Sequence, residues 1–234
     1  MTHAQASIGP VLVTGCSSGI GRAAAVRLHD AGLTVYASAR RVDSLADLAD
    51  RGIHTVPLDV TDEAATQWAV AHVEAEAGPV GVLINNAGYG LYGAVEQVPL
   101  TEARRQFETN FFGPVRLIQL VLPGMRRAGR GRILNVSSMG GRTTLPGGAF
   151  YHASKHALES LSDALRMELR QFGVDVVLIE PGPVNTPWND VAAATLDEGQ
   201  DDDPYAAYKK GVTDSFGTRT AFGRSSITKR TRVN

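Results

Sequence analysis

Tyr151 and Lys155 have side chains and a spacing suited to proton transfer. Residues four apart share one face of a helix, so both side chains can reach the same site. A free phenol has a pKa of about 10 and is a poor base at neutral pH, but a neighbouring ammonium favours the phenolate and lowers that pKa. Such a pair can give a proton to a carbonyl oxygen or take one from an alcohol. Because this spacing is also common on solvated helix faces, the prediction depends on the motifs around it.

A glycine-rich segment near the N-terminus has the composition of a phosphate-binding loop. Its glycines permit a tight turn and let backbone N–H groups approach a pyrophosphate, which the N-terminus of the following helix also attracts. A merely flexible turn is the alternative, but the segment lies between a predicted strand and a predicted helix, as a dinucleotide site requires. The expected cofactor contacts in this loop are Gly15, Ser17, Ser18, Gly19, Ile20 and Gly21.

The end of the second predicted strand indicates which dinucleotide binds. An acidic residue there would hold an adenosine ribose hydroxyl and repel a 2′-phosphate. This chain has Ser38-Ala39-Arg40-Arg41 instead, and Arg40 can pair with a phosphate through charge-assisted hydrogen bonds. We therefore predict NADP(H), with NAD(H) as the alternative. Asp59, at the end of the third predicted strand, could accept a hydrogen bond from the adenine amino group or could cap the next helix.

Apolar runs and helical periodicities alternate along the chain and predict the elements that position these residues. The predicted strands are 11–14, 33–39, 53–58, 80–84, 132–136 and 174–179. The alternation predicts an α/β, doubly wound parallel sheet of the Rossmann type, with helices on both faces. A long helix over 101–127 is expected to bend at Pro114.

The chain is predicted to be one dinucleotide-binding and catalytic domain over residues 1–234. No linker-like change of composition divides it before position 179, but residues 189–234 are atypical. This segment is acidic and then basic, and offers no convincing seventh strand. Disorder is one alternative for it, and residues 203–211 could form one short helix.

Composition excludes several classes of protein. The chain has 234 residues, 43% hydrophobic and 20% charged, which is sufficient for a sizeable core. Its 23 Lys and Arg balance 24 Asp and Glu, so bulk charge does not favour a nucleic-acid partner. The single cysteine, Cys16, excludes an internal disulfide and fits a reducing compartment. With no apparent secretory signal or transmembrane segment, we expect a cytoplasmic location.

Further motifs follow the glycine loop in a fixed order. They are Asn85-Asn86-Ala87-Gly88, Asn110, Ser138 thirteen residues before Tyr151, and Pro181-Gly182-Pro183-Val184-Asn185-Thr186. Together these motifs resemble the short-chain dehydrogenase/reductase family in its compact single-domain form. The loop and the second strand are most similar to the branch that includes hydroxysteroid and retinol dehydrogenases. The resemblance covers about residues 11–188, and the seventh strand usual in the family is apparently missing.

The resemblance implies a role for each site residue. Tyr151 is the expected general acid/base, and Lys155 is expected to bind the nicotinamide ribose and lower the tyrosine pKa. Ser138 would hold and polarise the substrate oxygen. Asn110 would hold a water that relays protons. The remaining expected cofactor contacts are Asp59, Val60, Asn86, Ala87, Gly88, Pro181, Gly182, Val184 and Thr186.

These observations predict an NADP(H)-dependent oxidoreductase that interconverts a carbonyl and an alcohol. The alternative is a catalytically silent dinucleotide-binding regulatory or scaffold protein, which the atypical C-terminus keeps open. A nucleotide-sugar epimerase is disfavoured because the chain has no room for a separate substrate domain. The residues expected to form an apolar substrate wall are Tyr89, Leu91, Met139, Leu145, Pro146, Phe150 and Trp188.

Two predictions concern other ligands and partners. His152 and His156 could share a metal, but no third ligand has a suitable spacing, so we expect no metal. We expect a homodimer formed through the helices over 101–127 and 149–172, with a tetramer left open.

Overall fold

The computed structural model describes residues 8–196 and 203–221 of the chain. Its strands are β1 (Val11–Val13), β2 (Val35–Ala39), β3 (His54–Pro57), β4 (Val82–Asn85), β5 (Gly131–Val136) and β6 (Val174–Ile179). Its helices are α1 (Gly19–Asp30), α2 (Ala46–Asp50), α3 (Glu63–Ala77), α4 (Leu100–Phe107), α5 (Gly113–Ala128), α6 (Ala149–Leu169), α7 (Trp188–Ala193) and α8 (Ala206–Ala221). Short 3₁₀ turns lie at Val42–Leu45, Met139–Gly141 and Arg170–Phe172.

The strands form one parallel sheet in the order β3-β2-β1-β4-β5-β6. The chain leaves β1 toward β2 and β3, then returns to the other side of β1 to begin β4. The strand order therefore reverses between β1 and β4, the place where ligands bind in open sheets of this kind. The predicted doubly wound fold is confirmed, and all six predicted strands are present.

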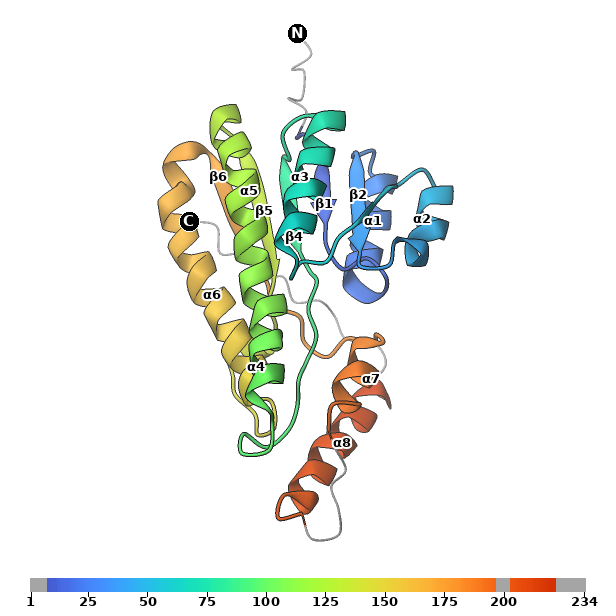
Figure 1. Cartoon of the computed structure of the whole chain (residues 1–234), viewed down its shortest axis with the longest axis vertical. Coiled ribbons are helices and arrows are strands. Elements are labelled where there is room, and N and C mark those ends of the chain that lie inside the picture. The colour runs from blue at the N-terminus through green and yellow to red at the C-terminus, as the bar shows by residue number, and fades with distance from the viewer. Residues whose placement is uncertain (1–7, 197–202, 222–234) are drawn as a thin grey trace.

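Two apolar clusters cover the two faces of the sheet. On one face α3, α5 and α6 pack over strands from β2 to β6, with Val73, Leu117 and Ile133 fully buried. On the other face α1 and α2 cover residues of β1 and β2, with Ala25 of α1 and Leu48 of α2 buried. Figure 1 shows α3, α5 and α6 side by side along the sheet. The near-continuous burial of β1 and β2 is what a strand covered on both faces requires.

The predicted bend at Pro114 takes the form of a π-helical segment, Glu108–Phe112, between α4 and α5. Proline has no N–H, so Pro114 cannot donate a hydrogen bond to the Asn110 carbonyl four residues earlier. The helix widens by one residue instead and continues in nearly the same direction (Figure 1). The widened segment places Asn110 on the buried side.

Two helices lie in the C-terminal segment for which the sequence leaves disorder open. These helices are α7 and α8, and α8 is longer than the short helix expected over 203–211. Both lie at the end of the sheet where α4 begins (Figure 1). Residues 197–202 and 222–234 of this segment lie outside the described residues. No helix within the described ranges is long and apolar enough to cross a membrane.

Candidate active site

A cavity of about 680 Å³ opens at the carboxyl ends of the strands. Most of the residues predicted to contact cofactor or substrate line it, although they come from segments far apart in the sequence. They are Gly15, Ser17, Ser18, Gly19, Ile20, Arg40, Asp59, Val60, Asn86, Ala87, Gly88, Ser138, Tyr151, Lys155, Pro181, Gly182, Val184 and Thr186. Of the predicted catalytic and cofactor residues, Gly21 and Asn110 are not part of the lining.

The glycine loop between β1 and α1 has the geometry of an anion cradle. Gly15 and Gly19 have φ angles of +72° and +59°, which L side chains rarely adopt. Ser18 is the N-cap of α1, yet its hydroxyl makes no capping hydrogen bond, and the first turn contains no acidic residue. The N–H groups and the positive end of this helix are therefore suited to a negatively charged ligand.

Gly21 supports the loop from behind. A Cβ at this position would collide with the Asn86 side chain and would lie 2.7 Å from the Gly15 carbonyl oxygen. Asn86 Nδ2 donates to the Thr14 and Gly15 carbonyl oxygens at 2.9 and 3.1 Å. Thr14 Oγ1 in turn accepts hydrogen bonds from the Asn86 and Ala87 N–H groups, each at 3.0 Å. These contacts fix the loop to the end of β4.

Arg40 and Asp59 lie at the β2 and β3 side of the cavity. Arg40 is exposed at the end of β2, where its guanidinium is available to a phosphate. Asp59 Oδ1 accepts hydrogen bonds from the Thr61 N–H and hydroxyl at 2.9 and 2.8 Å. The alternative in which Asp59 caps the next helix is wrong, because Asp62 is the N-cap of α3 and accepts from the Ala65 N–H.

Tyr151 and Lys155 lie one turn apart near the start of α6, and both line the cavity. Both are buried, with exposed fractions of 6% each. Lys155 Nζ donates to the Val136 carbonyl oxygen at 2.8 Å, which fixes the ammonium against the end of β5. Burial lowers the pKa of Lys155 from 10.5 to about 8, although the Glu159 carboxylate opposes this change.

The Tyr151 phenol has Ser138 beside it. Burial raises the pKa of Tyr151 above its ordinary value of 10, and hydrogen bonding with the Ser138 hydroxyl opposes the rise. The expected lowering of the tyrosine pKa by Lys155 stays a prediction, since burial and Ser138 are the causes that act on Tyr151 here. A phenol with a raised pKa keeps its proton at neutral pH and is suited to donate it.

Ser138 is held at the start of the 3₁₀ turn after β5. Its Oγ accepts a hydrogen bond from the Gly140 N–H at 3.0 Å, which fixes the side chain while leaving the hydroxyl proton to donate. The Met139 N–H donates to the Pro181 carbonyl oxygen at 3.1 Å, so the Ser138 segment is joined to the Pro181–Gly182 segment that follows β6. Tyr151 and Ser138 can thus contact the same oxygen atom of a ligand.

Asn110 lies behind the cavity rather than on its surface. Its Nδ2 donates to the Tyr89 carbonyl oxygen at 3.0 Å and to Ser154 Oγ at 3.2 Å, and its Oδ1 accepts from the Tyr89 N–H at 3.2 Å. The amide joins the π-helical segment to the loop after β4 and to α6. The side chain therefore positions the surrounding segments, and its water-holding role stays a prediction.

Aromatic side chains surround the Tyr151 end of the cavity. Of the predicted apolar wall, Tyr89, Met139, Leu145 and Trp188 line the cavity, whereas Leu91, Pro146 and Phe150 do not. The Trp188 ring centroid is 5.2 Å from that of Tyr151, and the Tyr92 centroid is 5.9 Å away. Tyr92, Val191 and Thr195 also line the cavity but were not predicted. The only signal for Tyr92 in the sequence is its place in an apolar loop directly after the Asn-Ala-Gly motif.

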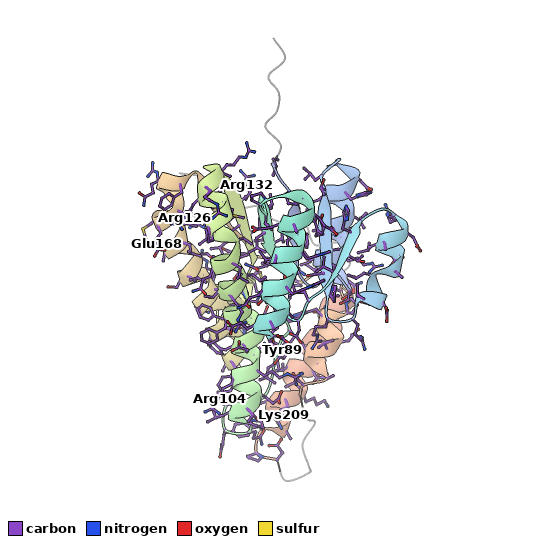
Figure 2. The ribbon with its side chains drawn as sticks, turned by 45° about the horizontal axis from the view of Figure 1, so that its top comes forward. Tyr89, Arg104, Arg126, Arg132, Glu168 and Lys209 are labelled. Atoms are coloured by element: carbon purple, nitrogen blue, oxygen red, sulfur yellow. The ribbon has the colours of Figure 1, made fainter. Side chains whose placement is uncertain are left out.

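Together these residues fit a dinucleotide. The cavity joins a phosphate cradle, a basic residue and a buried proton donor in one continuous space. Figure 2 shows Tyr89 and Lys209 toward the end of the molecule that holds the cavity, and Arg132 and Glu168 toward the opposite end. The positions of the conformationally unusual glycines and of Arg40 match the way that such cofactors bind at a switch point of a parallel sheet.

Comparison with known proteins identifies the class that this fold and site define. Residues 10–197 match the sequence profile of the short-chain dehydrogenase family. The chain is 39% identical over 193 residues to the 3-ketodihydrosphingosine reductase of Bacteroides thetaiotaomicron, covering 82% of this chain and 70% of the relative.

Solved structures support the same class. A short-chain dehydrogenase from Streptomyces avermitilis is 38% identical, with a TM-score of 0.78, over 91% of this chain and 80% of that one. A metagenomic short-chain oxidoreductase in complex with NADP is 34% identical, with a TM-score of 0.71, over 76% of this chain and 84% of that one. The chain therefore belongs to the short-chain dehydrogenase/reductase family and is an oxidoreductase of that family.

Proposed function

We propose that this protein is an NADP(H)-dependent oxidoreductase that reduces an apolar ketone or aldehyde to the alcohol and can catalyse the reverse reaction. The observation that carries the proposal is the convergence of Tyr151, Lys155 and Ser138 on one cavity with the glycine cradle. The proposed reaction is one that acts on CH–OH groups. The silent regulatory alternative is not favoured, because the named relatives are a reductase, a dehydrogenase and an oxidoreductase.

Each residue has a distinct part in the proposed binding mode. The glycine loop and the start of α1 bind the pyrophosphate, and Arg40 binds the adenosine 2′-phosphate. Asp59, Val60 and residues 86–88 line the adenosine side. Residues 181–186 bind the nicotinamide carboxamide. Lys155 holds the nicotinamide ribose hydroxyls, and the bound nicotinamide supplies the hydride.

The protein supplies the proton and the electrostatic stabilisation. The Ser138 hydroxyl donates a hydrogen bond to the substrate oxygen, which strengthens as negative charge develops there. Tyr151 then transfers its phenolic proton to that oxygen, and the adjacent Lys155 ammonium stabilises the phenolate that remains. In alcohol oxidation the same atoms act in reverse. The carbonyl is thus polarised and protonated by two side chains on separate segments.

The apolar character of the substrate is proposed from the ring contacts around Tyr151. Trp188, Tyr92 and Leu145 offer an aromatic and aliphatic surface next to the proton donor. A hydrocarbon portion of the substrate would bury itself against this surface, with roughly 25 cal/mol gained per Å² of apolar area. The named relative that acts on 3-ketodihydrosphingosine is consistent with such a substrate.

Three further proposals concern organisation. We retain one catalytic domain over the whole chain, a cytoplasmic location and a homodimer formed by α4, α5 and α6. Exposed apolar side chains on these helices are consistent with the dimer: Leu100, Phe112 in the π-helical segment, and Met167. Sedimentation of the purified chain tests the dimer directly.

Fluorescence titration with NADPH, followed by NADPH oxidation with a panel of apolar and polar carbonyl compounds, tests the proposed function. We expect saturable binding, and turnover that is faster with apolar ketones or aldehydes than with polar ones of the same size. Binding without turnover across the whole panel would contradict the enzymatic proposal. Turnover restricted to polar substrates would contradict only the proposed substrate class.

A further inference from the structure

Arg142 contacts two glutamates that belong to two other segments of the site. It follows directly after the 3₁₀ turn Met139–Gly141, and its Nη2 lies 2.9 Å from Glu159 Oε2 on α6. The same Nη2 lies 3.0 Å from Glu180 Oε1, directly after β6, and Arg142 Nε lies 3.2 Å from that oxygen. One guanidinium therefore joins the three segments that carry Ser138, the Tyr151–Lys155 pair and the Pro181–Gly182 motif.

Glu159 is unusual among these residues because it is almost completely buried. Its exposed fraction is 4%, although the side chain of its partner Arg142 is 52% exposed. Glu159 lies one helical turn after Lys155, on the side away from Tyr151. A buried, unpaired carboxylate lowers the stability of the fold. The presence of Glu159 next to the buried Lys155 therefore requires an explanation.

The polar and charged groups around the Lys155 and Glu159 side chains come from every element packed against them. On α6, Glu159 acts on Lys155 and Asp163 acts on Glu159, and Tyr151 lines the same cavity as Lys155. The Val136 carbonyl of β5 accepts from Lys155, and Lys155 Nζ and the Asn110 Oδ1 of the π-helical segment both lie near Gly88. Around Glu159 the further groups are Ser137, Arg142 and Glu180.

We propose that Glu159 is a positioning residue: its carboxylate, held by Arg142, favours the charged form of the Lys155 amine inside the site and fixes α6 relative to the two loops that complete the site. Glu159 does not touch the reacting atoms. It acts through Lys155, whose ammonium must stay protonated in the proposed mechanism. Arg142 compensates the buried carboxylate and is itself anchored by Glu180.

The electrostatic directions agree with this arrangement. Glu159 raises the pKa of Lys155 against the larger effect of burial, so Lys155 stays charged to about pH 8. Burial raises the pKa of Glu159, while Ser137 and Arg142 lower it. Because the Glu159 charge raises the pKa of Lys155, its neutralisation should act on Lys155 directly.

Glu159→Gln tests this by removing the charge while preserving the shape. In the pH profile of kcat/KM, we expect the alkaline limb to move to lower pH by roughly one unit, because the unsupported Lys155 loses its proton sooner. Glu159→Asp keeps the charge, so its alkaline limb should lie close to the wild-type pH. A merely structural role would lower activity at every pH without moving the limb.

A second readout needs no turnover and so does not depend on the proposed function. Lys155 has a lowered pKa in the folded chain, so the unfolded chain binds more protons, and stability rises with pH from about 8 toward 10.5. In Glu159→Gln this rise should begin at lower pH, as followed by urea unfolding between about pH 7 and 9.5. Lys155→Met should abolish this part of the rise.

The matched control is Glu168→Gln, which makes the same chemical change on the same helix. Glu168 is exposed and lies at the far end of α6, away from the site (Figure 2). This variant should leave both the alkaline limb and the pH dependence of unfolding unchanged.

A double variant protects the test against misfolding caused by an unpaired Arg142. Glu159→Gln combined with Arg142→Met removes the buried pair as a unit and should show the same two shifts. A folded single or double variant in which neither shift occurs would overturn the proposal. Failure of both variants to fold would overturn it as well, in favour of a purely structural role. A shift in unfolding without any activity in the wild-type chain would support the role of Glu159 and contradict only the proposed function.

Discussion

The two halves of the cavity differ in whether backbone groups or side chains form them. The half at β1 and α1 is mostly backbone: a loop with glycines at positive φ, an uncapped helix N-terminus, and the Asn86 amide bonded to main-chain carbonyls. The half at α6 is made of buried side chains that carry charges or protons, Tyr151 and Lys155, with the buried Glu159 one turn further along the helix and outside the lining. The half at β1 and α1 lacks room for added atoms. In the half at α6, the proposed chemistry depends on each proton and charge.

This difference separates the effects expected of substitutions. In the backbone half, an added methyl group should reduce stability and cofactor binding together. At the Tyr151 end of the cavity, removal of the Tyr151 or Ser138 hydroxyl should leave the fold and cofactor binding intact and reduce only turnover. Variants from each half therefore test whether binding and chemistry are carried by separate groups.

Ser138→Ala should have the largest effect of the three variants that follow. The substitution removes the hydroxyl that donates to the substrate oxygen, and we expect kcat to fall by roughly 100- to 1,000-fold. NADPH affinity, measured by fluorescence, should stay within about twofold of the wild type. A loss of affinity as large as the loss of turnover would show that Ser138 belongs to the binding half.

Arg40→Asp should weaken NADPH binding by roughly 10- to 100-fold, because it replaces a charge-assisted partner of the 2′-phosphate with a repulsive carboxylate. NADH binding should change little. The matched control is Arg41→Asp, at an exposed neighbour that does not line the cavity. Equal losses for NADPH and NADH would remove Arg40 from phosphate recognition.

Gly21→Ala should destabilise the chain by about 1–3 kcal/mol, because the new Cβ would press on the Asn86 side chain and on the Gly15 carbonyl. Urea unfolding measures this change. Gly211→Ala is the control, since Gly211 lies in α8 with no atom within 4 Å of an added Cβ. There the helix should gain about 0.5–1 kcal/mol. A neutral Gly21→Ala would mean that the loop can move to accept the methyl group.

The sequence is sufficient to predict the sheet because its strands are buried on both faces. Apolar runs around 11–14 and 174–179 became β1 and β6, with only small differences at their ends. Local turn chemistry also predicted the glycine loop between β1 and α1. Pro114 was recognised as a disturbance, but its result, a π-helical segment instead of a sharp bend, depends on how α4 and α5 pack against the rest of the chain.

The parts that could not be predicted depend on contacts between distant segments. Arg142, Glu159 and Glu180 have no shared spacing, and only the fold brings their charges together. Tyr92 packs against Tyr151 for the same reason. The pKa of Tyr151 also could not be predicted from the Tyr-x-x-x-Lys spacing, because burial outweighs the influence of neighbouring groups.

The most direct test of the proposed chemistry is a comparison of Tyr151→Phe with the wild type under single-turnover conditions, with both saturated with NADPH. The substitution removes one oxygen atom from the buried ring. We expect unchanged NADPH binding and a rate of carbonyl reduction lower by roughly 100- to 10,000-fold. A variant that binds NADPH and reduces the substrate at a rate close to the wild type would contradict Tyr151 as the proton donor.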